Sequence, residues 1–205
     1  MVNIILSKVL VVSTITLLSV SAYAATYLKK DISGYGVIYD NDGDTNLRAL
    51  PSLASVITAK VKSGTLVYCH NEGGRFGDFC FSTTPKGDGY IHASRINDLQ
   101  QGNSVLSTEN NEILASDNLN VHITYKNNEY QSICFSRPHH TPCIPKSYLD
   151  DIKGVEKGTH MVYSDTTSKK LYLTASYINK QHIYNVIWTL NPDDSIERWI
   201  YAEQF

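Results

Sequence analysis

The sequence predicts a mostly β protein of two domains, a small β-barrel over 35–96 and a β-rich α+β domain over 112–205 with an antiparallel meander and one short helix. Short runs of β-branched and aromatic residues alternate with Gly, Asp, Asn and Pro turn signals. No stretch of the first domain has the 3.6-residue period of an amphipathic helix. The polar segment 97–111 has no sustained period and is the predicted linker.

Residues 1–24 are predicted to be a cleaved signal peptide. Lys8 precedes an apolar run from Val9 to Val20, and Ala22-Tyr23-Ala24 places small residues where a signal peptidase cuts, so cleavage is expected after Ala24. A membrane anchor is the alternative, but this run is short for a hydrocarbon layer of about 30 Å. We therefore expect a periplasmic or secreted protein without a membrane span after cleavage.

The net charge argues against nucleic-acid partners. Removal of residues 1–24 takes one lysine, which leaves 17 Lys and Arg against 20 Asp and Glu, a formal charge of −3. A nucleic-acid-binding surface needs clustered basic residues to displace counterions from phosphates. The longest basic runs are the pairs Lys29-Lys30 and Lys169-Lys170, so no nucleic-acid partner is expected.

The four cysteines all follow the predicted signal peptide and predict two disulfides. An oxidising compartment favours pairing of an even number of cysteines, and four cysteines allow three pairings. Cys69 and Cys80 enclose Gly73-Gly74, and Cys134 and Cys143 enclose a Pro-His-His sequence, so each pair brackets a turn. The economical solution is 69 with 80 and 134 with 143, which stabilises each hairpin by about 2–3 kcal/mol.

The first domain is expected to consist of short strands. The segment 55–62 alternates apolar and polar residues, with Val56, Ala59 and Val61 as inward candidates. The other extended segments are 36–39, 46–49 and 66–69, followed by a Gly-rich hairpin and by Phe76, Phe79 and Phe81. Many short strands separated by turns indicate a small all-β barrel.

Aspartates at 40, 42 and 44 raise the alternative of a calcium site. An EF-hand loop needs glycine at its sixth position and glutamate at its twelfth, whereas Gly43 is fourth counted from Asp40. We therefore expect a solvated turn rather than a metal site.

Three pieces of the first domain together resemble a bacterial SH3-like domain. They are Asn46-Leu47-Arg48 with Pro51-Ser52, then Gly64-Thr65, and then Gly89-Tyr90-Ile91. The resemblance covers about 35–96, roughly a third of the mature chain, and departs from the usual pattern at Phe76 and Tyr90, where such modules commonly carry Trp. It implies an SH3-like barrel with a binding role, often toward peptidoglycan peptides or wall-associated proteins.

The second domain carries three long segments that predict the meander. Tyr184, Val186, Trp188 and Leu190 share one face at period two, so this face is expected to meet a core. The three segments are 171–178, 182–190 and 196–201, with turn compositions at 178–181 and 191–195.

One helix is predicted at 147–153, because Pro145 suits a first helical position and Gly154 can end it. A Gly-Thr sequence precedes a strand both at 64–65 and at 158–159, which leaves a divergent second copy of the barrel as an alternative for this half.

The densest polar cluster is Cys134, His139, His140 and Cys143. A thiolate beside a histidine is the nucleophile of a cysteine hydrolase, and two Cys with two His can bind zinc. Export disfavours a free thiolate, and the adjacent histidines disfavour convergence on one ion, so a disulfide-closed hairpin is expected. The sequence has no serine nucleophile elbow, His-Glu-x-x-His motif or phosphate loop. We predict no catalytic residue, metal or cofactor.

The predicted binding face lies on the barrel and is rich in aromatic residues. Tyrosine accounts for 14 of 205 residues, and it suits surfaces that bury carbon while satisfying a hydroxyl. Arg48 suits a structural role equally well. The ligand-binding candidates are Tyr39, Phe76, Tyr90 and His92, with Asn46 and Arg48 as polar partners.

Three functional hypotheses follow. The leading one is a non-catalytic, exported envelope protein whose barrel binds peptidoglycan or a wall-associated protein. The alternative is a periplasmic immunity or inhibitor protein that blocks a secreted toxin or hydrolase that degrades the cell wall. The third is the cysteine hydrolase.

Overall fold

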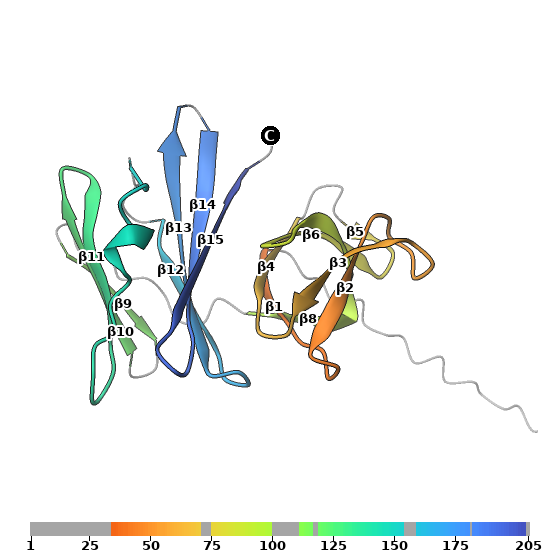
Figure 1. Cartoon of the computed structure of the whole chain (residues 1–205), viewed down its shortest axis with the longest axis horizontal. Helices are drawn as coiled ribbons and strands as arrows, with labels where there is room; N and C mark the ends of the chain where they lie inside the picture. Colours follow the sequence, from red (N-terminus) through yellow and green to blue (C-terminus); the bar gives the residue numbers. More distant parts are fainter. Residues whose placement is uncertain are drawn as a thin grey trace, which may run out of the picture.

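The computed structural model describes residues 34–70, 75–99, 111–116, 119–153, 159–180 and 182–203. The predicted signal peptide and the larger part of the predicted linker lie outside these residues. The described chain is mostly β, as the sequence predicts, with its strands in three antiparallel sheets (Figure 1).

The first sheet curls into the barrel. Its strand order is β3-β2-β7-β6-β4-β1-β8, with β5 paired to β6. The short 3₁₀-helix η1 (Ala93–Arg95) separates β7 from β8. The strands are β1 (Gly34–Ile38), β2 (Asp44–Arg48), β3 (Ile57–Lys62), β4 (Leu66–Cys69), β5 (Arg75–Phe76), β6 (Phe79–Thr84), β7 (Gly87–His92) and β8 (Ile96–Asp98). The barrel therefore continues to Asp98, two residues into the segment predicted as linker.

The barrel core is small and aliphatic. It consists of Ile38, Leu47, Val61, Val67, Ile91, Ala93 and Ile96 with the two cysteines of the first disulfide. Two glycines permit close strand approach: a Cβ on Gly36 would overlap Ile96 and meet the carbonyl of Asn97 at 3.0 Å, and one on Gly89 would lie 2.8 Å from the carbonyl of Arg48. The strand pairs β1–β8 and β2–β7 therefore require glycine at these positions.

The prediction that Val56 points into the barrel core is wrong. Val56 is 73% exposed, whereas Ala59 and Val61 contact the core as expected. The pairing of β2 with β3 shifts register between Leu47 and Arg48, and β3 begins only at Ile57. Val56 therefore belongs to the preceding loop and lies outside the alternation of the strand.

The C-terminal half consists of two further sheets and not of a second barrel. The three-stranded sheet has β10 at its centre, and the four-stranded sheet runs in chain order. The predicted meander is confirmed as the last three strands. The strands are β9 (Asn111–Ser116), β10 (Leu119–Lys126), β11 (Glu129–Ser136), β12 (Met161–Asp165), β13 (Lys170–Asn179), β14 (His182–Leu190) and β15 (Ile196–Ala202).

The predicted helix after Pro145 is shorter than expected. The structure has a single 3₁₀-turn, η2 (Lys146–Tyr148), followed by turns through Asp151. Leu149 and Ile152 are buried in the core of this half, so the chain bends to bring both side chains inward. An isolated segment of this length gains too few hydrogen bonds to offset the cost of nucleating an α-helix. Gly154, its predicted end, lies outside the described residues.

The four-stranded sheet lies between the three-stranded sheet and the barrel (Figure 1). One of its faces packs on the three-stranded sheet through Val186, Trp188 and Leu190, which confirms the predicted core face of β14. The opposite face packs on the barrel through Tyr163, Tyr172 and Ile187. Burial on both faces explains why six consecutive residues at the end of β14 are buried.

Tyrosines dominate the contact between the barrel and this sheet. The hydroxyls of Tyr35 and Tyr201 lie 3.1 Å apart, and the ring of Tyr35 packs 5.6 Å from that of Tyr163. The hydroxyl of Tyr172 donates a 3.0 Å hydrogen bond to the carbonyl of Gly64 in the turn between β3 and β4. Each hydroxyl thus has a partner where its ring is buried, as a stable interface requires.

Both predicted disulfides are present, Cys69–Cys80 and Cys134–Cys143. They hold all four cysteines of the chain, so none remains as a free thiol. The first lies in the barrel core and the second beside the loop after β11. Among the described residues, no helix is long and apolar enough to cross a bilayer.

The tyrosine interface predicts a loss of stability at alkaline pH. Burial raises the pKa of Tyr163 to about 12 and also raises the pKa values of Tyr35 and Tyr201. The unfolded chain releases these protons near pH 10. The stabilisation from the buried, protonated tyrosines is therefore fully present below pH 10. The free energy of unfolding decreases from pH 10 toward 12, by up to about 1.4 kcal/mol per pH unit for each such tyrosine.

Urea unfolding at pH 7 to 12 measures this effect. Y163F removes one titrating group and is expected to give a shallower decrease above pH 10. A free energy of unfolding that stays constant to pH 12 contradicts the prediction.

Candidate functional site

A groove of about 400 Å³ lies on the barrel, where the turn between β1 and β2 meets β3 and the segment around η1. Its walls are polar and carry both signs of charge. The lining residues are Asp40, Asp42, Asp44, Thr45, Asn46, Arg48, Leu53, Lys60, His92, Ser94 and Arg95.

The structure brings together three of the predicted binding residues in this groove. Asn46 and Arg48 reach it from β2, and His92 reaches it from the end of β7. Tyr39, Phe76 and Tyr90 do not line it. The groove therefore coincides with the polar part of the predicted site and not with its aromatic part.

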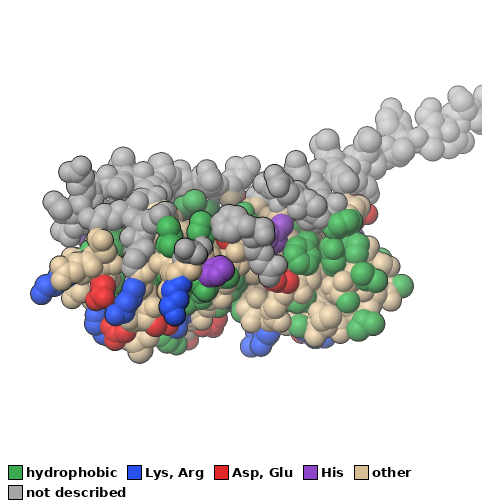
Figure 2. All heavy atoms as spheres, turned by 90° about the horizontal axis from the view of Figure 1, so that it is seen from above, with side chains coloured by type: hydrophobic (Ala, Val, Ile, Leu, Met, Phe, Trp, Pro, Cys, Tyr) green, Lys and Arg blue, Asp and Glu red, His purple; other side chains and the backbone are tan. Residues whose placement is uncertain are grey.

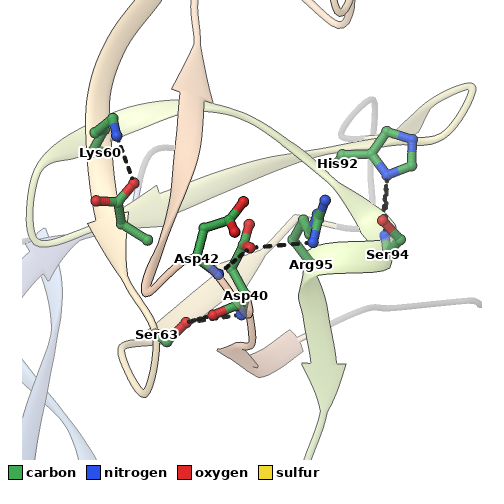
Figure 3. Close-up of polar contacts among 8 residues, drawn as sticks. Asp40, Asp42, Lys60, Ser63, His92, Ser94 and Arg95 are labelled. Atoms are coloured by element: carbon green, nitrogen blue, oxygen red, sulfur yellow. Dashed lines mark hydrogen bonds and ion pairs between the residues drawn. The ribbon is translucent and has the colours of Figure 1, made fainter.

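The acidic turn at 40–44 forms one wall of the groove. The carboxylate of Asp40 accepts hydrogen bonds from the backbone N–H of Asp42 at 3.1 Å and from Arg95 at 3.3 Å. Ser63 fixes the turn from the other side, because its Oγ both accepts from the N–H of Asp40 and donates to its carbonyl, each at 2.8 Å. Figure 3 shows Asp40, Asp42 and Arg95 converging above Ser63. The predicted solvated turn is thus an ordered Asx turn.

The charges in the groove are only partly compensated. Lys60 pairs with Asp44 at 2.9 Å, and this hydrogen bond raises the pKa of the lysine. The Arg95 side chain is 45% exposed although it reaches Asp40. Within the described chain, the Asp42 carboxylate has no ion pair. The exposed Asp42 carboxylate and the partly exposed Arg95 guanidinium, which Asp40 contacts through one nitrogen, therefore lie in one groove.

Arg48 is structural within this site. Its Nη1 donates to the carbonyls of Leu53 and Ser55, both at 2.9 Å. The hydroxyl of Ser55 accepts the N–H of Leu50 at 2.9 Å, and the N–H of Ala49 donates to Val56 at 3.0 Å. Together these bonds tie Arg48 to the backbone of the loop 49–56, which supports the structural alternative that the sequence left open for Arg48.

The loop 49–56 presents an apolar surface that sequence reasoning missed. Leu50, Leu53 and Val56 are 64%, 69% and 73% exposed, and Leu53 also borders the groove. Hydrophobic side chains gather at the end of the barrel remote from the C-terminal sheets (Figure 2). The sequence does place three aliphatic residues around the turn-forming Pro51-Ser52, which could have indicated an exposed apolar loop. Val56 was instead assigned to the alternating pattern of the following strand. Exposed apolar side chains on an ordered loop are typical of a protein-binding surface.

The aromatic candidates form a separate cluster on the outer surface of the barrel sheet. Tyr90 packs against Phe76 at 5.4 Å and against Phe81 at 5.2 Å between ring centroids. His92 lines the groove separately from this cluster: its ring packs on Phe79 at 5.1 Å, and its Nδ1 lies 2.8 Å from the hydroxyl of Ser94. Tyr39 stands apart and is 47% exposed.

The cysteines of the Cys-His cluster in the second domain are paired with each other, which leaves neither a nucleophilic thiolate nor a two-Cys, two-His zinc site. Cys134 and Cys143 form a disulfide, so neither is a thiolate nucleophile or a zinc ligand. The Nε2 of His140 lies 2.6 Å from Asp194, whose other oxygen accepts from Arg137 at 2.9 Å. These contacts link the loop after β11 to the β14–β15 turn. In the part of the chain that is described, no His, Cys, Asp and Glu side chains are grouped as a metal site requires.

No protein-family model, curated protein or solved structure matches the chain.

The role of Arg48 predicts that Arg48→Leu loosens the loop. The change removes both guanidinium donors, so the carbonyls of Leu53 and Ser55 lose their partners, at a cost of about 1–2 kcal/mol. Hydrogen exchange of the Ala49 amide, which is bonded to Val56, is expected to accelerate roughly tenfold. Lys60→Ala, in the same groove but without contact to the loop, is the control. Equal exchange rates in Arg48→Leu and the unsubstituted protein contradict the structural role.

Proposed function

We propose that the protein is a non-catalytic, exported binding protein of the bacterial envelope and that the barrel groove binds peptides of peptidoglycan. The observation that carries the proposal is the presence of opposite charges in one groove: the Asp42 carboxylate, and the Arg95 guanidinium, which is 45% exposed although it contacts Asp40. Cell-wall peptides carry free carboxylates and amino groups along a short chain. Arg95 suits the carboxylate of such a peptide, and Asp42 suits its ammonium group.

Two further features support this proposal. The resemblance of 35–96 to SH3-like modules implies recognition of wall peptides, and the groove includes Asn46, Arg48 and His92 of the motif-bearing strands. Two disulfides are compatible with an oxidising compartment outside the cytoplasm. The polar lining suits a ligand that keeps part of its hydration, and such ligands bind with modest affinity and strong salt dependence.

The inhibitor or immunity protein remains the second candidate, because the loop 49–56 favours a protein partner. Its exposed residues Leu50, Leu53 and Val56 are held on an ordered backbone, which limits the entropy lost when a partner binds. A loop of this kind can occlude the active site of a secreted hydrolase.

Pelleting with purified peptidoglycan sacculi tests the leading proposal. Arg95→Ala and Asp42→Asn each remove one groove charge, and each is expected to weaken binding about two- to fivefold, since pairs at exposed sites contribute up to about 1 kcal/mol. The matched controls are Lys126→Ala on the three-stranded sheet and Asp88→Asn on β7 outside the groove, and both should bind normally.

Protein that stays in the supernatant at low salt contradicts wall binding, as does equal pelleting of groove and control variants. The second candidate predicts a different result: Leu50→Asp together with Val56→Asp, both outside the groove lining, abolishes complex formation with a wall hydrolase encoded by a neighbouring gene, while pelleting with sacculi is unchanged.

A further inference from the structure

A second hollow, of about 250 Å³, lies between the barrel and the four-stranded sheet. Both halves of the chain build it, so neither forms this site alone. The barrel contributes Val61, Lys62, Gly64, Thr65, Leu66, Pro85 and Lys86, and the sheet contributes Thr189, Glu197 and Trp199.

Hydrogen bonds join the two walls of this interdomain cleft. The carbonyl of Gly64 accepts from the hydroxyl of Tyr172 at 3.0 Å and from the ammonium of Lys170 at 3.2 Å. Leu66 of the barrel packs in the same buried cluster as Tyr172 and Ile187 of the sheet. A cleft fixed by such contacts is preorganised, which lowers the entropy cost of binding a ligand.

Two lysines that line the cleft, Lys62 and Lys86, have no ion-pair partner among the described residues. In the described part of the chain, neither Lys62 nor Lys86 has a carboxylate within ion-pair distance, and both side chains belong to exposed residues. Lys170 differs, because Gly64 already accepts its hydrogen bond. A ligand carboxylate between Lys62 and Lys86 would compensate two like charges at once.

The remaining walls provide the complementary groups. Glu197 lines the cleft from β15, and its carboxylate, one oxygen of which accepts a 3.3 Å hydrogen bond from Asn191, suits an ammonium group. Trp199 is half-buried beside it, and its ring offers apolar area for the carbon chain of a ligand. Two lysines, one carboxylate and an indole in a small hollow match a short zwitterionic peptide more closely than they match a simple anion.

We propose that the interdomain cleft is a second peptide-binding site, in which Lys62 and Lys86 bind a free carboxylate of a peptide, Glu197 binds its ammonium group and Trp199 packs on its side chain. This inference rests on the proposed function for the class of ligand. It adds a site that is separate from the barrel groove, since the two hollows share no lining residue.

Intrinsic fluorescence gives a direct test, because the chain has two tryptophans and Trp188 is fully buried. The probe is the free tetrapeptide of peptidoglycan, titrated into the full mature chain. A saturable change in tryptophan emission is expected, and Trp199→Phe should abolish it. The double variant Lys62→Ala, Lys86→Ala should raise the dissociation constant at least tenfold. Both changes are at exposed positions, and circular dichroism checks that the fold is retained.

The control for the cleft is the groove double variant Lys60→Ala, Arg95→Ala. It is expected to retain the fluorescence change while its binding to sacculi is weakened. Amidation of the peptide carboxylates should weaken the fluorescence response as much as loss of both lysines does. If inorganic phosphate changes the tryptophan emission as much as the peptide does, the cleft binds simple anions and the peptide assignment is overturned.

The cleft site fails if the unsubstituted protein gives no saturable change, or if the Lys62, Lys86 double variant binds as tightly as the unsubstituted protein. Such a failure leaves groove-dependent pelleting with sacculi intact. Failure of the proposed function appears instead as unchanged pelleting of the groove variants.

Discussion

Burial of the four-stranded sheet on both faces is the constraint on which the rest of the structure depends. One face shares a core with the three-stranded sheet around Trp188, and the other contacts the barrel through Tyr163 and Tyr172. A sheet with a single buried face would leave the second row of large side chains in water. Because the barrel covers that row, the two halves share a buried contact, and the interdomain cleft lies beside Gly64 at the edge of this contact.

On the barrel, an ordered loop lies next to a groove whose charged side chains are partly exposed. The barrel contributes a small closed core, and Arg48 and Ser55 order the apolar loop next to the groove without filling it. The groove itself keeps partly exposed charges on Asp42 and Arg95. Rigid walls with solvated charged groups favour recognition of short polar ligands, because few protein side chains need to be ordered on binding.

Local patterns predicted the strands, the disulfide pairing and the inner face of β14, because alternation and turn residues are local properties. The three-layer arrangement was not predictable in this way. It depends on contacts such as Tyr172 with Gly64, which are separated by 108 positions, and tyrosine in a strand indicates neither burial nor exposure. In the candidate groove, Asn46 and His92 are residues that the sequence analysis proposed for binding. Asp42 and Arg95 were not proposed, since only the folded barrel brings the acidic turn beside η1.

The central proposal is that peptides of the cell wall bind in the barrel groove, and mapping of backbone amide chemical shifts tests it most directly. The isotope-labelled mature protein would be titrated with soluble peptidoglycan fragments. We predict saturable shifts concentrated at residues 40–48 and 92–95, with little change in the three-stranded sheet. Shifts that are absent from these residues, or that lie only on the three-stranded sheet, contradict the proposal.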